Sequence, residues 1–370
     1  MLLTIDDSQR IIGNVSRLPS LTFRGRCLVG NSNSNSNSNS NSNNSNNSSD
    51  GGKLDTDLGG HYIYYEVHGT GPIKLFFVSG ILCPIATYWF QVEALASDPR
   101  FTVVVHESRG VGWSDTPTSS RMSIKELAKD AFELLNHLGW NRGVHLAGLS
   151  LGGMVTQELA MLDPTRFTSV WLISTSAGKS FPTLDAVTAV VRAFAFLGTA
   201  QTWQRIVEVT FSSEWLDSVT DGRSITNREW TANFSLSLFQ DSRPPTLGGI
   251  LGHVFSGATF NVTDEQLKKL KAASPDTKFV VMHGTNDFMI RHSFGEHLAD
   301  MLNAELVLYP GAGHVVTIEN AAQVNADMLR RILEWENMSG LHPSDSGIGG
   351  SDVDGIETVE QTPVPTPATV

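Results

Sequence analysis

Cysteine is scarce in this chain of 370 residues, with Cys27 and Cys83 as its only two. Two cysteines cannot build a disulfide framework, and such sparing use is typical of proteins in a reducing compartment. Basic residues are also few, 26 against 38 acidic ones, and they form no basic stripe. The chain is therefore not expected to bind nucleic acid.

Long apolar runs are missing as well. No stretch of 18 apolar residues is present, so we expect no integral membrane segment. The first seven residues also lack the charged-then-apolar order of a secretory signal. These absences favour a cytoplasmic location. Four arginines without an acidic neighbour between residues 8 and 30 keep a mitochondrial location as an alternative.

The two ends of the chain have compositions that do not support a packed core. Residues 31–49 are a tract of Asn and Ser with no apolar side chain, and we expect residues 1–53 to be a disordered extension. Residues 332–370 carry seven acidic side chains and no Lys or Arg. We expect residues 339–370 to be a disordered acidic tail.

Short apolar runs alternate with helix-like segments in the remaining body. Successive apolar residues suit strands that helices cover on both faces. The expected strands are residues 61–67, 74–79, 101–105, 143–147, 169–173, 278–282 and 304–309. A helix is expected from Ser123, which forms a capping box with Glu126, and another from about Ala321. This order predicts an α/β fold with a mainly parallel, doubly wound sheet.

Residues 179–260 break the alternation, because they show helical apolar spacing and no clear strand. They hold eight of the 18 phenylalanines and three of the eight tryptophans. We expect a helical lid here, inserted into a core made of residues 54–178 and 261–338. The aromatic side chains either line an apolar substrate pocket or pack the lid helices together.

A Gly-x-Ser-x-Gly sequence, from Gly148 to Gly152, lies between an expected strand and an expected helix. Such a junction holds Ser150 on a sharp, strained turn with its hydroxyl clear of the sheet. The first N–H groups of the following helix have no partner within the helix and favour an anion beside this serine. The arrangement indicates acyl transfer with Ser150 as the nucleophile.

A nucleophilic serine needs a base, and the base needs an orienting carboxylate. Asp287 follows one expected strand and His314 follows the next, and loops at the carboxyl ends of parallel strands share one edge of the sheet. We predict a catalytic triad of Ser150, Asp287 and His314, with Asp185 as the alternative acid. Four other histidines are interpreted as packing or surface residues: His145, His283, His292 and His297. None has the spacing of a metal site, so neither a metal nor another cofactor is expected.

The oxyanion of the tetrahedral intermediate needs two N–H donors. One prediction is the N–H of Leu151, directly after the nucleophile. The other is the N–H of Ile81 or of Leu82, in the turn where Gly80 allows close backbone approach. We expect Gly80, Leu82 and Trp113 to contact the substrate.

These segments together resemble the α/β-hydrolase fold superfamily. The matching motifs are residues 148–153, 284–287, 311–314 and 109–114, where Arg109 is expected to be buried and paired. The resemblance implies an eight-stranded sheet with a helical lid, and a mechanism in which His314 takes the proton of Ser150. Two positions differ from the common pattern of the family: Ser79 stands where His is usual, and Glu107 where Asp is usual.

The resemblance is greatest to the lidded branch that contains small-molecule esterases, enol-lactonases, C–C bond hydrolases and cofactor-free perhydrolases. It implies a serine hydrolase that cleaves small to medium apolar carboxylic esters or lactones through an acyl-enzyme. An acyltransferase or a C–C bond hydrolase with the same triad is one alternative. A ligand-binding protein without hydrolytic activity is another, because a fold does not determine a function. No feature of the sequence indicates an oligomeric state.

Overall fold

The computed structural model describes residues 18–30, 60–116, 122–178, 206–220, 223–240 and 242–338. The chain divides into two units, residues 1–329 and 330–370, and each is taken by itself. The described part of the second unit is the end of helix α13 (Ala321–Met338), where Arg330 and Glu334 form an exposed ion pair one helical turn apart. The sheet and the candidate site belong to the first unit.

The described residues of the first unit form an eight-stranded sheet in the order β1-β2-β4-β3-β5-β6-β7-β8. The strands are β1 (Leu21–Val29), β2 (His61–Gly69), β3 (Ile73–Val78), β4 (Phe101–His106), β5 (Val144–Leu149), β6 (Phe167–Ile173), β7 (Lys278–Gly284) and β8 (Glu305–Tyr309). The pairs β1–β2 and β2–β4 are antiparallel, and all later pairs are parallel. The predicted fold class and the eight strands implied by the resemblance are confirmed.

Strand β1 corrects the expectation that residues 1–53 form a disordered extension. It pairs with β2 along its length, from Leu21 opposite His68 to Val29 opposite His61. Cys27 and Val29 face the core and are buried, while the residues between and beside them are exposed. Only one face of this edge strand packs against the core, so its sequence lacks the continuous apolar run that identifies the inner strands. The Asn/Ser tract lies outside the described residues.

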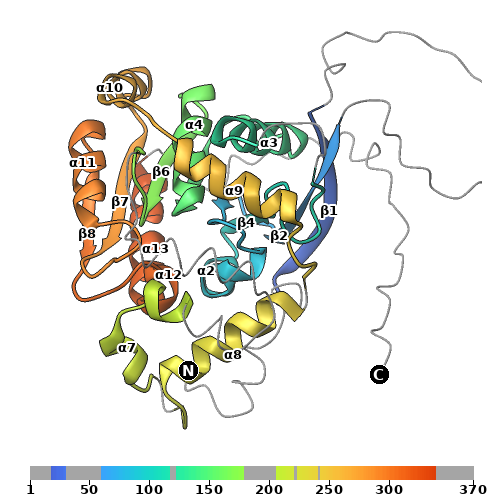
Figure 1. The fold of residues 1–370 in the computed structure, drawn as a ribbon. Coiled ribbons are helices and arrows are strands. Elements are labelled where there is room, and N and C mark those ends of the chain that lie inside the picture. The colour runs from blue at the N-terminus through green and yellow to red at the C-terminus, as the bar shows by residue number, and fades with distance from the viewer. Residues whose placement is uncertain are drawn as a thin grey trace, which may run out of the picture. The chain divides into compact units, whose positions relative to one another are not determined.

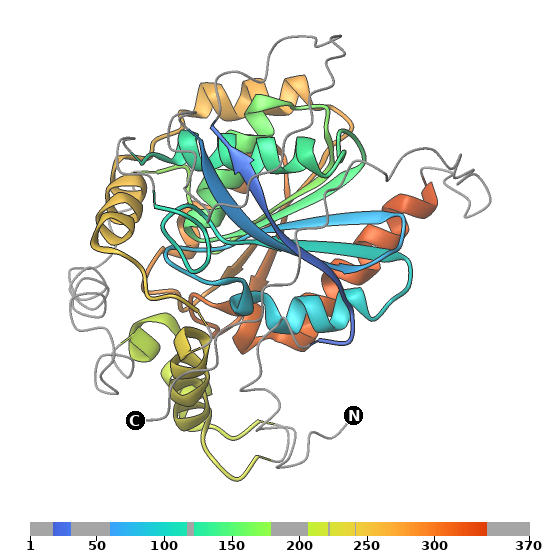
Figure 2. The ribbon, with the colours of Figure 1, turned by 90° about the vertical axis from the view of Figure 1, so that its right-hand side faces the viewer.

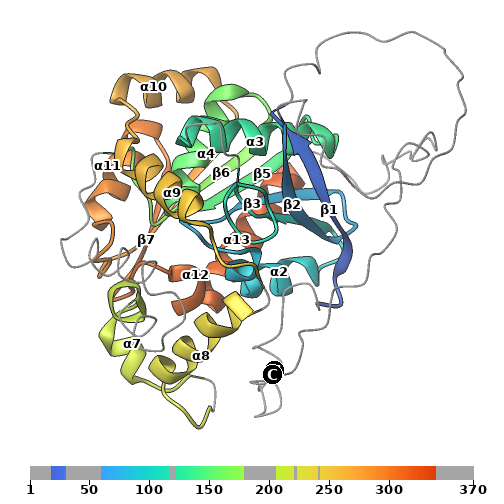
Figure 3. The same cartoon turned by 45° about the vertical axis from the view of Figure 1, so that its right-hand side comes forward.

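Helices cover both faces of the sheet, which explains the unbroken apolar runs of the inner strands. Phe76 and Val78 of β3 belong to one buried cluster with residues of α3, α4, α10 and α11, whereas Phe77 faces the opposite side, where it packs on Tyr88. Figure 3 shows α3 and α4 on one side of the strands and α2 on the other. These helices are α2 (Trp89–Ala96), preceded by the 3-10 helix η3 (Ile85–Tyr88), α3 (Ile124–His137), α4 (Leu151–Leu162), α10 (Asp264–Ala273), α11 (His292–Leu302) and α12 (Val316–Glu319). The predicted cap of α3 is present, because Ser123 Oγ accepts the N–H of Glu126.

We call residues 179–260, between β6 and α10, the insertion. Its described residues form α7 (Ser213–Asp217), α8 (Asn227–Gln240) and α9 (Leu247–Thr259) and contain no strand. Gly178 and Asn261 pair as an isolated antiparallel bridge, so the insertion leaves and rejoins the core at one place. Figures 1 and 2 show α7, α8 and α9 outside the two layers that cover the sheet.

A cluster of aromatic side chains lies where the insertion meets the core. The rings of Trp230 and Phe234 stack with centroids 5.1 Å apart, and both side chains are buried. They belong to one cluster with Phe211 and with Ile318 of α12. These aromatic residues therefore pack the insertion against the core. Residues 179–205 of the insertion lie outside the described residues.

Candidate active site

Ser150 joins β5 to α4 in a conformation that few residues other than glycine adopt, with φ 57° and ψ −120°. A left-handed conformation of this kind costs about 1–2 kcal/mol. A Cβ atom on Gly148 would lie 2.3 Å from Thr156 Oγ1, and one on Gly152 would lie 2.1 Å from the carbonyl oxygen of Val78. The predicted strained turn is therefore present, and both glycines of its motif are required by close contacts.

Hydrogen bonds hold the strained turn in place. The N–H of Ser150 donates to the carbonyl oxygen of Ile173 at 2.8 Å, and Thr175 Oγ1 donates to the carbonyl oxygen of Ser150 at 2.7 Å. Both contacts come from the end of β6 and the residues after it. The backbone of Ser150 is thus fixed by the neighbouring strand.

The structure brings the predicted base and acid together. His314 Nδ1 lies 2.7 Å from Asp287 Oδ2, and both residues are 5% exposed. The N–H groups of Met289 and Ile290 donate to Asp287 Oδ1 at 2.8 and 2.9 Å. A carboxylate only accepts, so Nδ1 of His314 carries a proton, and in the neutral ring Nε2 is then the acceptor. That tautomer is the one a general base requires.

His283, which we interpreted as a packing residue, is also a partner of the acid. Its Nε2 lies 3.0 Å from Asp287 Oδ2 and 2.9 Å from the carbonyl oxygen of Ile290. Both neighbours are acceptors, so Nε2 carries the proton and donates. The position of His283 at the end of β7, four residues before Asp287, does not by itself predict this contact.

Four N–H groups therefore point at the carboxylate of Asp287: the backbone N–H groups of Met289 and Ile290 and the ring N–H groups of His283 and His314. Burial by itself raises the pKa of Asp287, but the charge of His314 and the hydrogen bonds from His283 and His314 outweigh it. The pKa of this carboxyl lies below its ordinary value as a result. Asp287 stays ionised and holds the imidazole of His314 in one orientation.

Backbone contacts join the loops that carry the acid and the base. The N–H of Asn286 donates to the carbonyl oxygen of Ala312 at 2.9 Å. Glu319 Oε2 accepts the N–H groups of Gly313 and Ser212, and its Oε1 accepts the hydroxyl of Ser212. The insertion is thereby attached to the loop of His314.

The turn after β3 lies beside Ser150. A Cβ atom on Gly80 would lie 3.7 Å from Ser150 Cβ, an ordinary contact, so close approach is not the reason for this glycine. The hydroxyl of Tyr88 donates to the carbonyl oxygen of Val78 at 2.9 Å and accepts the N–H of Leu149 at 3.0 Å. This buried phenol links the turn to the strand that carries Ser150.

One of the two alternative oxyanion donors is already engaged. The N–H of Leu82 donates to Nδ1 of His253 at 3.3 Å, and Leu82 itself has a left-handed φ of 53°. The N–H of Ile81 is then the remaining candidate in this turn. Leu151 opens α4, so its N–H has no acceptor within the helix.

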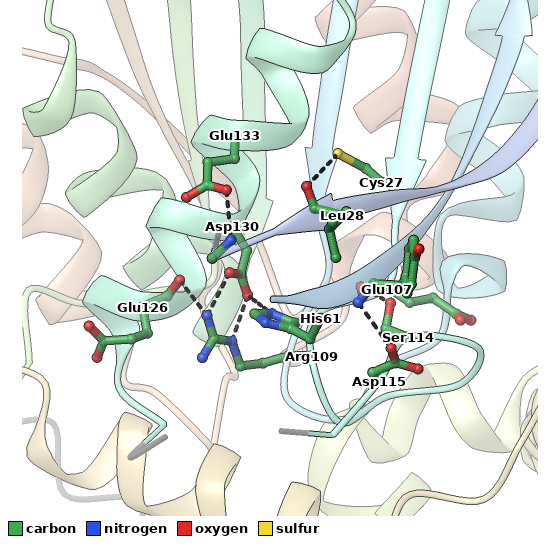
Figure 4. A network of polar contacts seen from close by, with 12 residues as sticks. Cys27, Leu28, His61, Glu107, Arg109, Ser114, Asp115, Glu126, Asp130 and Glu133 are labelled. Carbon is green, nitrogen blue, oxygen red and sulfur yellow. Dashed lines mark hydrogen bonds and ion pairs between the residues drawn. The ribbon is translucent and has the colours of Figure 1, made fainter. Parts of the chain in front are cut away.

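The loop after β4 is held by a buried ion pair, as predicted for Arg109. Its Nε and Nη2 donate to the two oxygens of Asp130 at 2.6 and 2.5 Å. His61 Nε2 lies 3.2 Å from Asp130 Oδ2. Figure 4 shows Arg109 and His61 converging on this carboxylate from different elements. A pair of this kind fixes the loop rather than reacting, because every oxygen is occupied.

Trp113, the expected substrate contact in this loop, is partly exposed. The guanidinium of Arg243 lies 4.6 Å from the centroid of its ring, and Arg243 belongs to the insertion. The ring therefore lies between the core and the insertion, and its contact with a substrate stays a prediction.

Glu107, at the end of β4, is 1% exposed, and its Oε2 accepts the N–H of Trp113 at 2.6 Å. Burial is the main reason why the pKa of Glu107 is raised to about 8, and Glu66 adds to it, while the N–H of Trp113 acts against it. The folded protein then keeps a proton that the unfolded chain loses above the ordinary pKa of 4.5. Stability is full below that value and falls as the pH rises to about 8.

We therefore expect Glu107→Gln to remove a pH dependence of stability. The amide still accepts the N–H of Trp113 and cannot ionise. From about pH 5 to pH 8.5 the wild type should lose roughly 2–4 kcal/mol of unfolding free energy through Glu107, and the variant should not show this loss. Urea unfolding at both pH values measures this difference. Glu93→Gln, at an exposed position of α2, is the control. A parallel loss of stability in wild type and Glu107→Gln would contradict a protonated Glu107.

The remaining histidines and acidic residues named in the sequence analysis lie in different surroundings. Among these residues no group of three or more His, Cys, Asp and Glu side chains is arranged to hold a metal ion. His145 is buried and bonds to Ser169 Oγ at 2.7 Å, His292 is partly exposed, and His297 is exposed. Asp185, the alternative acid, lies outside the described residues. None of the helices described is long and apolar enough to cross a membrane.

The curated proteins that this chain resembles differ in name. Over 276 residues the chain is 23% identical to a protein named putative carbamate hydrolase RutD from Stutzerimonas stutzeri, which covers 74% of this chain and 97% of that one. Over 113 residues it is 32% identical to 3-oxoadipate enol-lactonase 2 from Acinetobacter baylyi, covering 30% of this chain and 41% of that one.

Solved structures share the fold. The enol-lactonase from Burkholderia xenovorans matches with a TM-score of 0.60 at 20% identity, covering 74% of this chain and 97% of that one. A thermophilic esterase from Thermogutta terrifontis matches with a TM-score of 0.60 at 21% identity, covering 75% and 95%. The family model described as the alpha/beta hydrolase fold matches residues 75–321, more than half of the chain. The protein therefore belongs to the α/β-hydrolase family.

Proposed function

We propose that this protein is a serine hydrolase that cleaves carboxylic esters or lactones through an acyl-enzyme. The observation that carries the proposal is the His314–Asp287 pair, bonded through Nδ1 of His314, at the same edge of the sheet as the strained turn of Ser150. Each of the three residues follows the carboxyl end of a parallel strand. Their order in the chain is that of a nucleophile, an acid and a base.

In this mechanism Ser150 Oγ attacks the carbonyl carbon while His314 Nε2 takes its proton. The N–H groups of Leu151 and Ile81 stabilise the oxyanion. Collapse of the intermediate breaks the C–O bond, and the imidazolium gives its proton to the leaving alkoxide. Water then attacks the acyl-enzyme, His314 takes a proton from it and returns one to Ser150, and the carboxylic acid leaves. Asp287 orients the imidazole throughout and is not protonated.

We further propose that the insertion is a lid over this site, on a core of residues 54–178 and 261–338 to which β1 is added. Its attachment to the loop of His314 through Glu319 and to the turn of Leu82 through His253 supports this proposal. Gly80, Leu82 and Trp113 are the proposed substrate contacts of the core. We propose an apolar substrate of small to medium size, as the resemblance to the lidded branch of the family implies.

A burst assay with p-nitrophenyl acetate tests the proposed function. We expect a rapid release of one p-nitrophenolate per active site, followed by slower turnover, because deacylation of the acyl-enzyme is then a separate step. A panel of esters with increasing acyl length, a lactone and a carbamate defines the substrate class. The carbamate is included because one relative bears the name of a carbamate hydrolase. Absence of any release would favour the ligand-binding alternative.

The same panel separates hydrolysis from acyl transfer. With an alcohol acceptor added, a transferase forms the new ester faster than the free acid, whereas a hydrolase forms mainly the acid. A C–C bond hydrolase would leave the ester panel almost untouched and cleave a vinylogous diketone instead. Product analysis by mass spectrometry distinguishes these outcomes.

A further inference from the structure

Helix α9 of the insertion approaches the core backbone to backbone. A Cβ atom on Gly249 would lie 2.5 Å from the carbonyl oxygen of Gly110, so no larger residue allows this contact. Gly110 follows Arg109, whose side chain is fixed by the buried pair with Asp130. One helical turn after Gly249, His253 is fully buried at this contact. The helix is thereby placed against a rigid part of the core.

The imidazole of His253 joins two loops of the core. Its Nε2 lies 2.9 Å from the carbonyl oxygen of Arg109, and its Nδ1 lies 3.3 Å from the N–H of Leu82. A carbonyl only accepts and an N–H only donates, so His253 must be the neutral tautomer with its proton on Nε2. Burial lowers the pKa of His253 to about 4, so this form persists at neutral pH.

We propose that His253 is a positioning residue for the oxyanion site: by accepting the N–H of Leu82 it holds the turn after β3 so that the N–H of Ile81 faces the reacting carbonyl. The inference rests on the proposed function. Leu82 has a left-handed φ of 53°, a conformation that costs about 1–2 kcal/mol for a residue with a side chain. The hydrogen bond to His253 offsets part of that cost and occupies the one competing donor of the turn.

Through His253 the insertion would align the oxyanion donor as well as cover the site. Arg109 is anchored on α3 through Asp130, and its carbonyl oxygen sets the position of His253. His253 in turn sets the position of Leu82. The oxyanion donor is therefore aligned by a chain of contacts that passes through the insertion and returns to the core.

Kinetics of His253→Phe test the proposal. The phenyl ring fills the same space but makes neither hydrogen bond, so we expect kcat to fall by about 10- to 100-fold with KM changed by less than about twofold. The affinity for a boronic acid, which mimics the tetrahedral intermediate, should fall in parallel. His253→Gln retains a donor and an acceptor and should recover most of the loss. Ser256→Ala, on the same buried face of α9, is the matched control, because its hydroxyl bonds within the helix.

Two outcomes would overturn the inference: kcat within twofold of wild type in His253→Phe, or a loss that appears in KM alone. Nitrogen NMR of the wild type gives a test that needs no variant. Nε2 of His253 should be protonated and Nδ1 bare from about pH 5 to pH 9, since its pKa is about 4. A proton on Nδ1 would exclude the bond from Leu82. Absence of any p-nitrophenolate release by the wild type refutes the proposed function instead, so the two failures are distinguishable.

Discussion

Ser150→Ala should lower kcat/KM for p-nitrophenyl acetate by a factor on the order of 10⁴–10⁶ and abolish labelling by a serine-reactive phosphonate. The loss is large because the variant removes the only atom that the mechanism joins covalently to the acyl group. Folding should be unaffected, since the bonds that hold this turn come from the backbone of Ser150 and not from its hydroxyl. Steady-state kinetics, mass spectrometry of the labelled protein and a thermal melt measure the three effects.

Two further variants make this test specific. Ser97→Ala changes an exposed serine at the end of α2 and should leave activity and labelling unchanged. Ser150→Gly also removes the hydroxyl but adopts a φ of 57° without strain, so it should be more stable than Ser150→Ala by about 1 kcal/mol. Full activity or labelling in Ser150→Ala would refute the assignment of the nucleophile.

Asp287→Asn should lower kcat by a factor on the order of 10³–10⁴. An amide has only one acceptor oxygen, which the N–H groups of Met289 and Ile290 keep. Its NH₂ group would then face Nδ1 of His314 and the N–H of His283. His314 must give up its proton on Nδ1 to accept from this amide, and the proton moves to Nε2. The base is then blocked in the tautomer that cannot receive the proton of the serine.

The matched control for this variant is Asp264→Asn. Asp264 also pairs with a histidine, His297, at 2.8 Å, but on the exposed surface. Loss of the Asp264–His297 pair should change kcat by less than about twofold, because an exposed ion pair contributes little to the stability of the fold. Equal effects of Asp287→Asn and Asp264→Asn on kcat would contradict a role for Asp287 in orienting the base.

The sequence predicted the parts of the site that follow from strand order. Ser150, Asp287 and His314 each stand just after an apolar run, and parallel strands bring such positions to one edge. The buried pair of Arg109 was also predicted, from its place after the fourth strand. These predictions depend on local patterns and on a topology with few alternatives.

The parts that the sequence did not predict are contacts between distant segments. His253 and Leu82 are 171 residues apart, and no local pattern marks a lone histidine in a helix as the partner of a turn. The role of His283 depends on how far the loop of Asp287 folds back, which spacing does not determine. Strand β1 was missed because its neighbour in the sequence is the Asn/Ser tract, whose composition suggested that the whole segment is disordered.

The pairing of β1 with β2 has a consequence for the Asn/Ser tract. Val29 lies opposite His61, so the 31 residues between them (30–60) connect two positions that are neighbours in the sheet. Closing such a connection costs free energy that grows only with the logarithm of its length, about 0.6 kcal/mol per doubling. Insertions or deletions of a few residues within the tract should therefore change the free energy of folding very little. Trimming the gene at codon 54 to remove the repeat would instead delete β1 and leave the edge of β2 open to aggregation.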